Sequence, residues 1–72
     1  MEKLKELEKQ YINKEIKKTD LYYDVARYLS NRRGEEFERA NDEVVAMSER
    51  LNLGQAALGK IFRKSREMYS RK

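Results

Sequence analysis

The side chains best suited to chemistry in this sequence are cations concentrated in residues 60–72. This segment holds six of them: Lys60, Arg63, Lys64, Arg66, Arg71 and Lys72. Six bases less one acid, Glu67, give the segment a net charge of +5, whereas the whole chain carries +4. Cations at intervals of three and four residues share one side of a helix, and such a surface suits the phosphates of a nucleic acid.

Other polar side chains could add sequence preference or position to this contact. Gln55 and Lys60 are the candidates for reading bases, because a glutamine amide can bond N6 and N7 of adenine and a lysine can reach O6 or N7 of guanine. Arg32 and Arg33 could hold a flanking phosphate, which fixes register but carries no sequence information. Alternatively, the two arginines only stabilise the C-terminus of a helix, which favours cations.

Catalytic and metal chemistry have few candidates. The chain has no Cys and no His, which removes the commonest metal ligands and general base. Acids adjacent in sequence, such as Glu35 and Glu36, point apart on a helix and do not form a carboxylate pair. We therefore expect no enzyme, no cofactor and no metal. The first residues mix charges with no apolar run, so we expect neither a signal peptide nor a membrane span, and an intracellular, cytoplasmic protein.

A helical hairpin must position the cations. Residues 43–51 predict an amphipathic helix, residues 52–54 a tight turn and residues 55–62 the start of a second helix that continues into the basic segment. Ser48 is the small residue that two steeply crossing helices need, and Asn52 tolerates a left-handed backbone in the turn. Inward-facing residues of the second helix recur at helical spacing: Leu58, Ile61, Phe62, Ser65, Met68 and Tyr69.

Residues 43–62 resemble the helix-turn-helix DNA-binding families. The positions that match their pattern are Ser48, Asn52, Leu53, Leu58 and Ile61. The chain departs from it at Gly54, where Ser or Thr usually caps the second helix, and at Gly59, which weakens a helix by about 0.5 to 1 kcal/mol relative to Ala. Residues 48–53 are also similar to the small subunits of phage DNA-packaging terminases. The resemblance implies a second helix placed in the major groove; the alternative is that the same turn joins two helices of an ordinary bundle.

The N-terminal half predicts two more helices. The first spans about residues 2–18, with one apolar face made of Leu4, Leu7, Tyr11, Ile12 and Ile16. The second begins near Thr19 and Asp20 and ends by Arg33, because Gly34 is typical of the position just after a helix. A single rod running through Gly34 remains the alternative, although the apolar positions on its two sides differ in phase.

A third helix is expected over residues 35–51. Its apolar residues recur at intervals of three and four: Phe37, Ala40, Val44, Met47 and Leu51. This seam forms either part of the core or a contact between two protomers. Three tyrosines, Tyr22, Tyr23 and Tyr28, are too many for one buried face, so at least one is expected to be exposed.

Together these elements predict an all-α fold, a small bundle of about four helices. Residues 1–72 form one domain, with an N-terminal helical hairpin over residues 1–33 and a helix-turn-helix half over residues 35–72. A chain this short buries a small core that self-association often completes, so a homodimer is expected. Two functions remain open. The first is a DNA-binding protein, either a regulator or an accessory factor of a phage or mobile element, and RNA is an alternative ligand. The second is a helical protein-binding module that offers the tyrosines or the third-helix seam to a partner.

Overall fold

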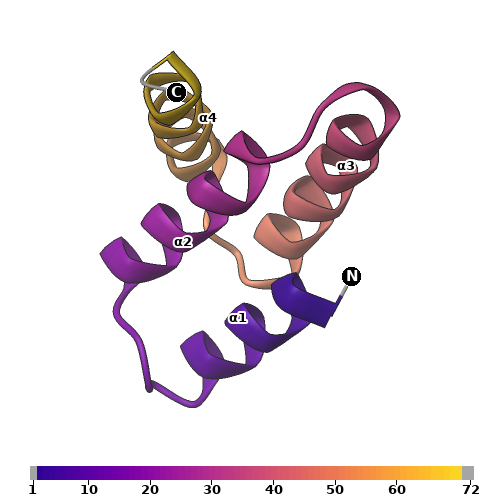
Figure 1. Cartoon of the computed structure of the whole chain (residues 1–72). Helices are drawn as coiled ribbons and strands as arrows, with labels where there is room; N and C mark the ends of the chain where they lie inside the picture. The colour runs from indigo at the N-terminus through magenta and orange to yellow at the C-terminus, as the bar shows by residue number, and fades with distance from the viewer. Residues whose placement is uncertain (1, 71–72) are drawn as a thin grey trace.

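The computed structural model describes residues 2–70 and places four α-helices in them. The helices are α1 (Glu2–Ile12), α2 (Lys18–Ser30), α3 (Gly34–Arg50) and α4 (Gln55–Ser70). Figure 1 shows α2 crossing the middle of the molecule, with α4 beside it and α1 and α3 on its other side. The prediction of a small all-α bundle is confirmed.

The first helix ends well before Lys18, so the prediction of a longer helix was wrong. Lys14 adopts a left-handed backbone with φ of 62°. Its N–H donates to the carbonyl of Tyr11 at 3.0 Å, and the N–H of Glu15 donates to the carbonyl of Gln10 at 2.8 Å. This pair of bonds around a left-handed residue is the Schellman motif, which satisfies the last carbonyls of a helix. The left-handed residue is a lysine and not a glycine, so residue type does not mark this helix end.

The early end divides the apolar face predicted for this segment. Leu4 and Leu7 are buried in the core, and Ile16 is half-buried beyond the helix. Ile12, expected to face inward, is 59% exposed. Only the first part of the predicted face therefore packs as a helix against the rest of the molecule.

An ion pair fastens α1 to the end of α3. Arg50 donates from Nε to Oε2 of Glu8 at 3.1 Å and from Nη2 to Oε1 at 2.8 Å. These hydrogen bonds, and the charge of the Glu8 carboxylate, raise the pKa of Arg50 above its already high value. The planar fork of the guanidinium matches both carboxylate oxygens, so the contact joins α1 to the end of α3 by two hydrogen bonds.

The second helix begins at Lys18, one residue before the predicted start at Thr19. Asp20 lies in its first turn and accepts a hydrogen bond from the backbone N–H of Lys17 at 3.2 Å, which satisfies a donor at the helix start. The helix ends at Ser30, which agrees with the prediction that it ends by Arg33. The break between the second and third helices is confirmed, because residues 31–33 separate them. Gly34, predicted to lie just after the second helix, instead begins α3 with φ of 59°, so that part of the prediction was wrong.

The turn between α3 and α4 has the predicted left-handed residue. Asn52 has φ of 56° and donates its N–H to the carbonyl of Glu49 at 3.1 Å. Leu53 donates to the carbonyl of Ser48 at 3.0 Å, which completes a second Schellman motif. Of the motif positions, Ser48 and Ile61 are buried, whereas Leu53 and Leu58 are half-buried. The prediction of a helical hairpin with a tight turn at Asn52 is confirmed.

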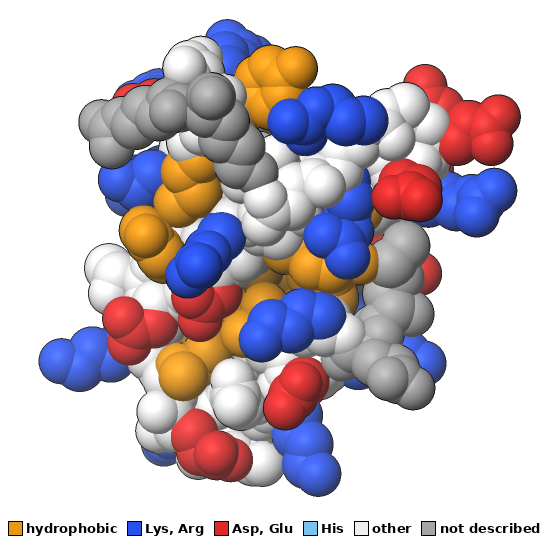
Figure 2. Space-filling view, in the orientation of Figure 1, with side chains coloured by type: hydrophobic (Ala, Val, Ile, Leu, Met, Phe, Trp, Pro, Cys, Tyr) orange, Lys and Arg blue, Asp and Glu red, His pale blue; other side chains and the backbone are white. Residues whose placement is uncertain are grey.

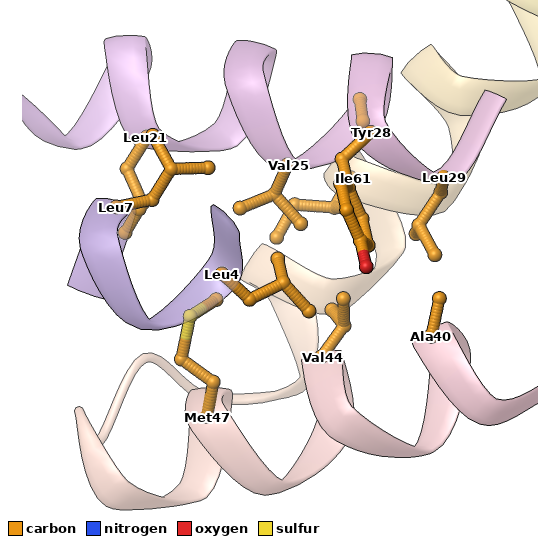
Figure 3. Close-up of a cluster of buried hydrophobic side chains, with 11 residues drawn as sticks. Leu4, Leu7, Leu21, Val25, Tyr28, Leu29, Ala40, Val44, Met47 and Ile61 are labelled. Atoms are coloured by element: carbon orange, nitrogen blue, oxygen red, sulfur yellow. The ribbon is translucent and has the colours of Figure 1, made fainter. Parts of the chain in front are cut away.

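One apolar cluster joins all four described helices. Figure 3 shows Leu4 and Leu7 of α1 meeting residues of α2 and α3 around Ile61 of α4. The members of the cluster are Leu4, Leu7, Leu21, Val25, Ala26, Tyr28, Leu29, Ala40, Val44, Met47 and Ile61. The most extensive helix–helix contact is between α2 and α4, and α3 and α4 touch only over a small area.

The regular apolar seam of α3 belongs to this core. Ala40, Val44 and Met47 are buried against the other helices of the same chain, whereas Phe37 is 37% exposed. Of the tyrosines in α2, Tyr28 is buried and Tyr23 is exposed, as the sequence predicted for at least one of the three. Tyr23 and Phe37 therefore expose aromatic surface that could contact another molecule.

Candidate nucleic-acid interface

The exposed side of α4 carries the predicted cations. Ala57, Ile61 and Ser65 recur every four residues and are buried against the bundle. The rest of an amphipathic helix faces solvent, and the exposed polar side chains of α4 include the predicted binding residues Gln55, Lys60, Arg63, Lys64 and Arg66. Lys60, Arg63 and Lys64 are exposed and follow one another at intervals of three and one residues along α4, and we call these three residues the basic crest.

The basic crest carries no neutralising ion pair. Within residues 2–70, the salt bridges are Glu35–Arg39 at 3.8 Å and Glu8–Arg50 at 2.8 Å, and neither involves α4. Glu67 follows Arg63 and Lys64 by four and three residues, so it is the one acid of α4 beside the crest. Arg71 and Lys72, also predicted to bind nucleic acid, lie outside the described residues.

Arg32 and Arg33 lie in the loop between α2 and α3, where both contact aromatic rings. The guanidinium of Arg32 lies 3.6 Å from the centroid of the Tyr28 ring, and its Nη1 donates to the Tyr28 carbonyl at 3.1 Å. The guanidinium of Arg33 lies 4.0 Å from the centroid of the Tyr69 ring, and its Nη1 donates to the Ser30 carbonyl at 2.9 Å. These cation–π and hydrogen-bond contacts hold the loop against α2 and α4.

The structure divides the predicted binding residues into two groups. Arg33 and Arg66 line the same hollow, next to the C-terminal half of α4. Gln55 begins α4, about 16 Å from Arg66 along the helix axis at 1.5 Å per residue. The two loop arginines therefore accompany Arg66, whereas Gln55 and Lys60 lie towards the other end of α4.

The hollow is a groove of about 540 Å³ between α4, the end of α2 and the start of α3. Its aromatic residues are Phe37, Phe62 and Tyr69, and Arg32, Arg33 and Arg66 also line it. We call it the aromatic groove. Tyr69 was predicted to face inward but is 50% exposed. Helical periodicity alone could not locate the groove, because it arises from the way α2 and α4 pack together.

Acidic side chains gather on α3, away from the basic crest. Six acids less two bases give α3 a net charge of −4, and four bases less one acid give α4 a net charge of +3. Glu35 and Glu36 occupy the first turn of α3, where the helix dipole favours acids. Figure 2 shows acidic side chains at the upper right, over the start of α3. Opposite charges therefore lie on the two helices of the hairpin.

Comparison with known proteins gives no relative for this chain: no family model, no curated protein and no solved structure matches it. None of the described helices has the length and apolar character needed to cross a bilayer. Among residues 2–70, no three Asp or Glu side chains are grouped so that they could hold a metal ion.

Proposed function

We propose that this protein binds DNA through the exposed side of α4, as a dimer, and acts as a regulator or as a phage or mobile-element accessory factor inside the cell. The observation that carries the proposal is the basic crest, in which Lys60, Arg63 and Lys64 are exposed on one side of a helix whose other side is buried. Clustered cations without acid partners bind phosphates and release the counterions condensed on a nucleic acid.

The two ends of α4 have different parts in the proposed complex. Gln55 and Lys60 lie in the first half of the helix and supply the candidates for base contacts in the major groove. Arg63, Lys64 and Arg66 follow and hold phosphates. Double-stranded RNA has a major groove too narrow for side chains to read, which favours DNA as the ligand.

The acidic side chains of α3 restrict how the protein can approach DNA. Phosphates would be repelled by the exposed carboxylates at the start of α3, Glu35, Glu36 and Glu38. The arrangement therefore favours a complex in which α4 faces the duplex and the start of α3 faces solvent.

Salt dependence of binding tests the proposal. We expect the purified protein to bind random labelled duplex DNA at about 50 mM salt and to lose most of this affinity at about 200 mM, measured by fluorescence anisotropy. Replacement of a phosphate contact, as in Arg63→Gln, should reduce the slope of log affinity against log salt by about 1. A matched control is Lys9→Gln, because Lys9 is an exposed cation on α1, a helix with no described contact to α4. Absence of binding at low salt, or an equal effect of the two variants, would refute the placement of DNA on α4.

Base contacts require a second comparison. We expect Gln55→Ala to weaken binding to a preferred duplex more than to a scrambled one, whereas Lys64→Gln should weaken both alike. An equal loss for Gln55→Ala on both duplexes would assign Gln55 to phosphate contact. No loss on either duplex would exclude the first turn of α4 from the groove.

A helical protein-binding module is the second candidate function. It is favoured by the aromatic groove, where Phe37 and Tyr69 expose large apolar side chains. Binding of a protein partner through such a surface depends little on salt, which distinguishes it from phosphate binding.

A further inference from the structure

The aromatic groove carries positive charge and no acid. Arg32, Arg33 and Arg66 line it, and none of the described residues in its lining is an Asp or a Glu. Neither of the ion pairs described within residues 2–70 involves these three arginines. Because no acid of the described chain neutralises them, the charge of the groove favours a partner that brings negative charge.

Arg33 is held in a position to receive a carboxylate. Its Nη1 donates to the carbonyls of Ser30 and Arg32, each at 2.9 Å. These described bonds use one nitrogen of the guanidinium, so Nε and Nη2 remain as donors. Arg50 of this chain uses the same two atoms, Nε and Nη2, to hold both carboxylate oxygens of Glu8. Arg33 therefore presents a positioned fork that can bind a carboxylate with two hydrogen bonds.

The exposed aromatic residues of the groove favour a partner larger than the hollow itself. Phe37 at the start of α3 and Tyr69 at the end of α4 both line the groove, and they are 37% and 50% exposed. A small molecule confined to about 540 Å³ covers little of the outer parts of these rings, whereas a segment of a protein extends over the rim. Aromatic side chains covered in this way contribute much of the free energy of a protein interface.

We propose that the aromatic groove binds an acidic segment of another protein. An apolar side chain of that segment, such as a phenylalanine or a leucine, packs against the aromatic residues of the groove, and a neighbouring carboxylate accepts hydrogen bonds from Arg33. Arg66 is not needed for this contact, so it remains available to the DNA phosphates that the proposed function gives it. The inference deepens the second candidate function, on which it rests, and does not depend on DNA binding.

A nucleic-acid strand fits the groove less well than such a segment. Glu36 and Glu38 are exposed and flank Phe37 in the sequence, so phosphates are repelled at the start of α3. A strand carries a phosphate at every nucleotide, whereas a protein segment can place its carboxylates beside the loop and its apolar residues towards α3. In addition, the Arg33 guanidinium covers one face of the Tyr69 ring at 4.0 Å, which removes a face on which a base would stack.

Selection from random peptides displayed on phage tests the chemistry of the partner. The whole chain is immobilised without DNA, and the selection is repeated on Tyr69→Ala and on the control Tyr23→Ala, because Tyr23 is 49% exposed but lies outside the groove lining. We expect the unaltered chain and the control to enrich peptides that combine Asp or Glu with Phe, Trp or Leu, and Tyr69→Ala to lose them. Circular dichroism of each variant confirms that it is folded.

Anisotropy of one enriched, labelled peptide tests the contact with Arg33. We expect Tyr69→Ala to weaken its binding by about tenfold or more. Replacing the acids of the peptide one at a time by their amides should, at one position, weaken binding to the unaltered chain by about two- to fivefold, the range for an exposed ion pair. The same replacement should have no effect on binding to Arg33→Gln, whereas it should keep its full effect on Lys9→Gln, an exposed cation changed outside the groove. An equal loss on Arg33→Gln and the unaltered chain would overturn the proposed carboxylate contact.

The selection also separates failure of this inference from failure of the functions proposed above. Enrichment of neutral or basic peptides that Tyr69→Ala abolishes would keep the groove as a protein-binding surface and refute its acidic partner. Absence of enrichment, or enrichment unaffected by Tyr69→Ala, would refute the second candidate function as well. Binding of labelled single-stranded oligodeoxythymidine that Tyr69→Ala weakens as strongly would assign the groove to nucleic acid instead. Arg63→Gln should leave peptide binding unchanged, so none of these outcomes decides whether the basic crest binds duplex DNA.

Discussion

Gly59 lies on the exposed side of α4, where an added Cβ would meet no atom within 4 Å. We expect Gly59→Ala to raise the free energy of unfolding by about 0.5 to 1 kcal/mol, because alanine loses less backbone freedom than glycine when a helix forms. Urea unfolding followed by circular dichroism measures the change.

Gly54→Ala is the control for this substitution. Its Cβ would also meet no atom within 4 Å, but Gly54 has φ of 90°, a backbone that an alanine adopts with strain. We therefore expect Gly54→Ala to destabilise the protein by about 1 kcal/mol or more. If both alanines changed stability in the same direction, the backbone at residue 54 or the helical state at residue 59 would differ from this structure.

Glu67 places a negative charge beside the basic crest. We expect Glu67→Gln to strengthen DNA binding several-fold at about 50 mM salt, and the gain to shrink as salt increases, because it arises from removed repulsion of phosphates. Anisotropy titrations at two salt concentrations measure it. Glu49→Gln, an exposed acid on α3, removes the same charge away from the crest and should change affinity much less. Equal gains for the two variants would indicate a response to net charge alone.

The helical conformation of the four segments and the breaks near Gly34 and Asn52 could be predicted from the sequence, because they depend on local chemistry. Gly34 and Asn52 both adopt the left-handed backbone that their types favour. The end of α1 could not be predicted, because Lys14 adopts the same backbone without being a type that favours it. The bonds that hold Lys14 there join backbone atoms, which leave no mark in the sequence.

The candidate site was predicted only in part. The crest follows from the spacing of Lys60, Arg63 and Lys64, since helical periodicity puts these residues on one side of α4. The aromatic groove depends on the packing of α4 against α2, a contact between elements far apart in the chain. Periodicity placed Tyr69 on the buried stripe, but at the edge of that contact the ring is half exposed.

The docking of α1 depends on two leucines in its first turns. We expect Leu7→Ala to lower the free energy of unfolding by about 2 to 4 kcal/mol, because Leu7 is buried in the common core and its truncation leaves a cavity. Ile12→Ala should change it by no more than about 0.5 kcal/mol, since Ile12 is 59% exposed. Urea titrations of the two variants provide the comparison. A large effect of Ile12→Ala would mean that the helix continues, packed, beyond this residue.

The molecule as a whole is expected to unfold in one step, because residues of all four described helices share a single core. The chain has five tyrosines and no tryptophan, so tyrosine fluorescence reports tertiary packing while circular dichroism reports helix content. The two signals should give the same urea midpoint. Two separated transitions would instead indicate that residues 1–33 and 35–72 fold as independent halves.

The separation of charge between α3 and α4 also gives the molecule an electric dipole moment. A net charge of −4 on one helix and +3 on the other is distributed over a body whose longest extent is 31 Å. Near any polyanion this dipole experiences a torque that turns α4 towards the negative charge before the surfaces touch, which raises the fraction of productive collisions. At 0.1 M salt the screening length falls to about 10 Å, so the torque then acts only at close range and the association rate constant decreases.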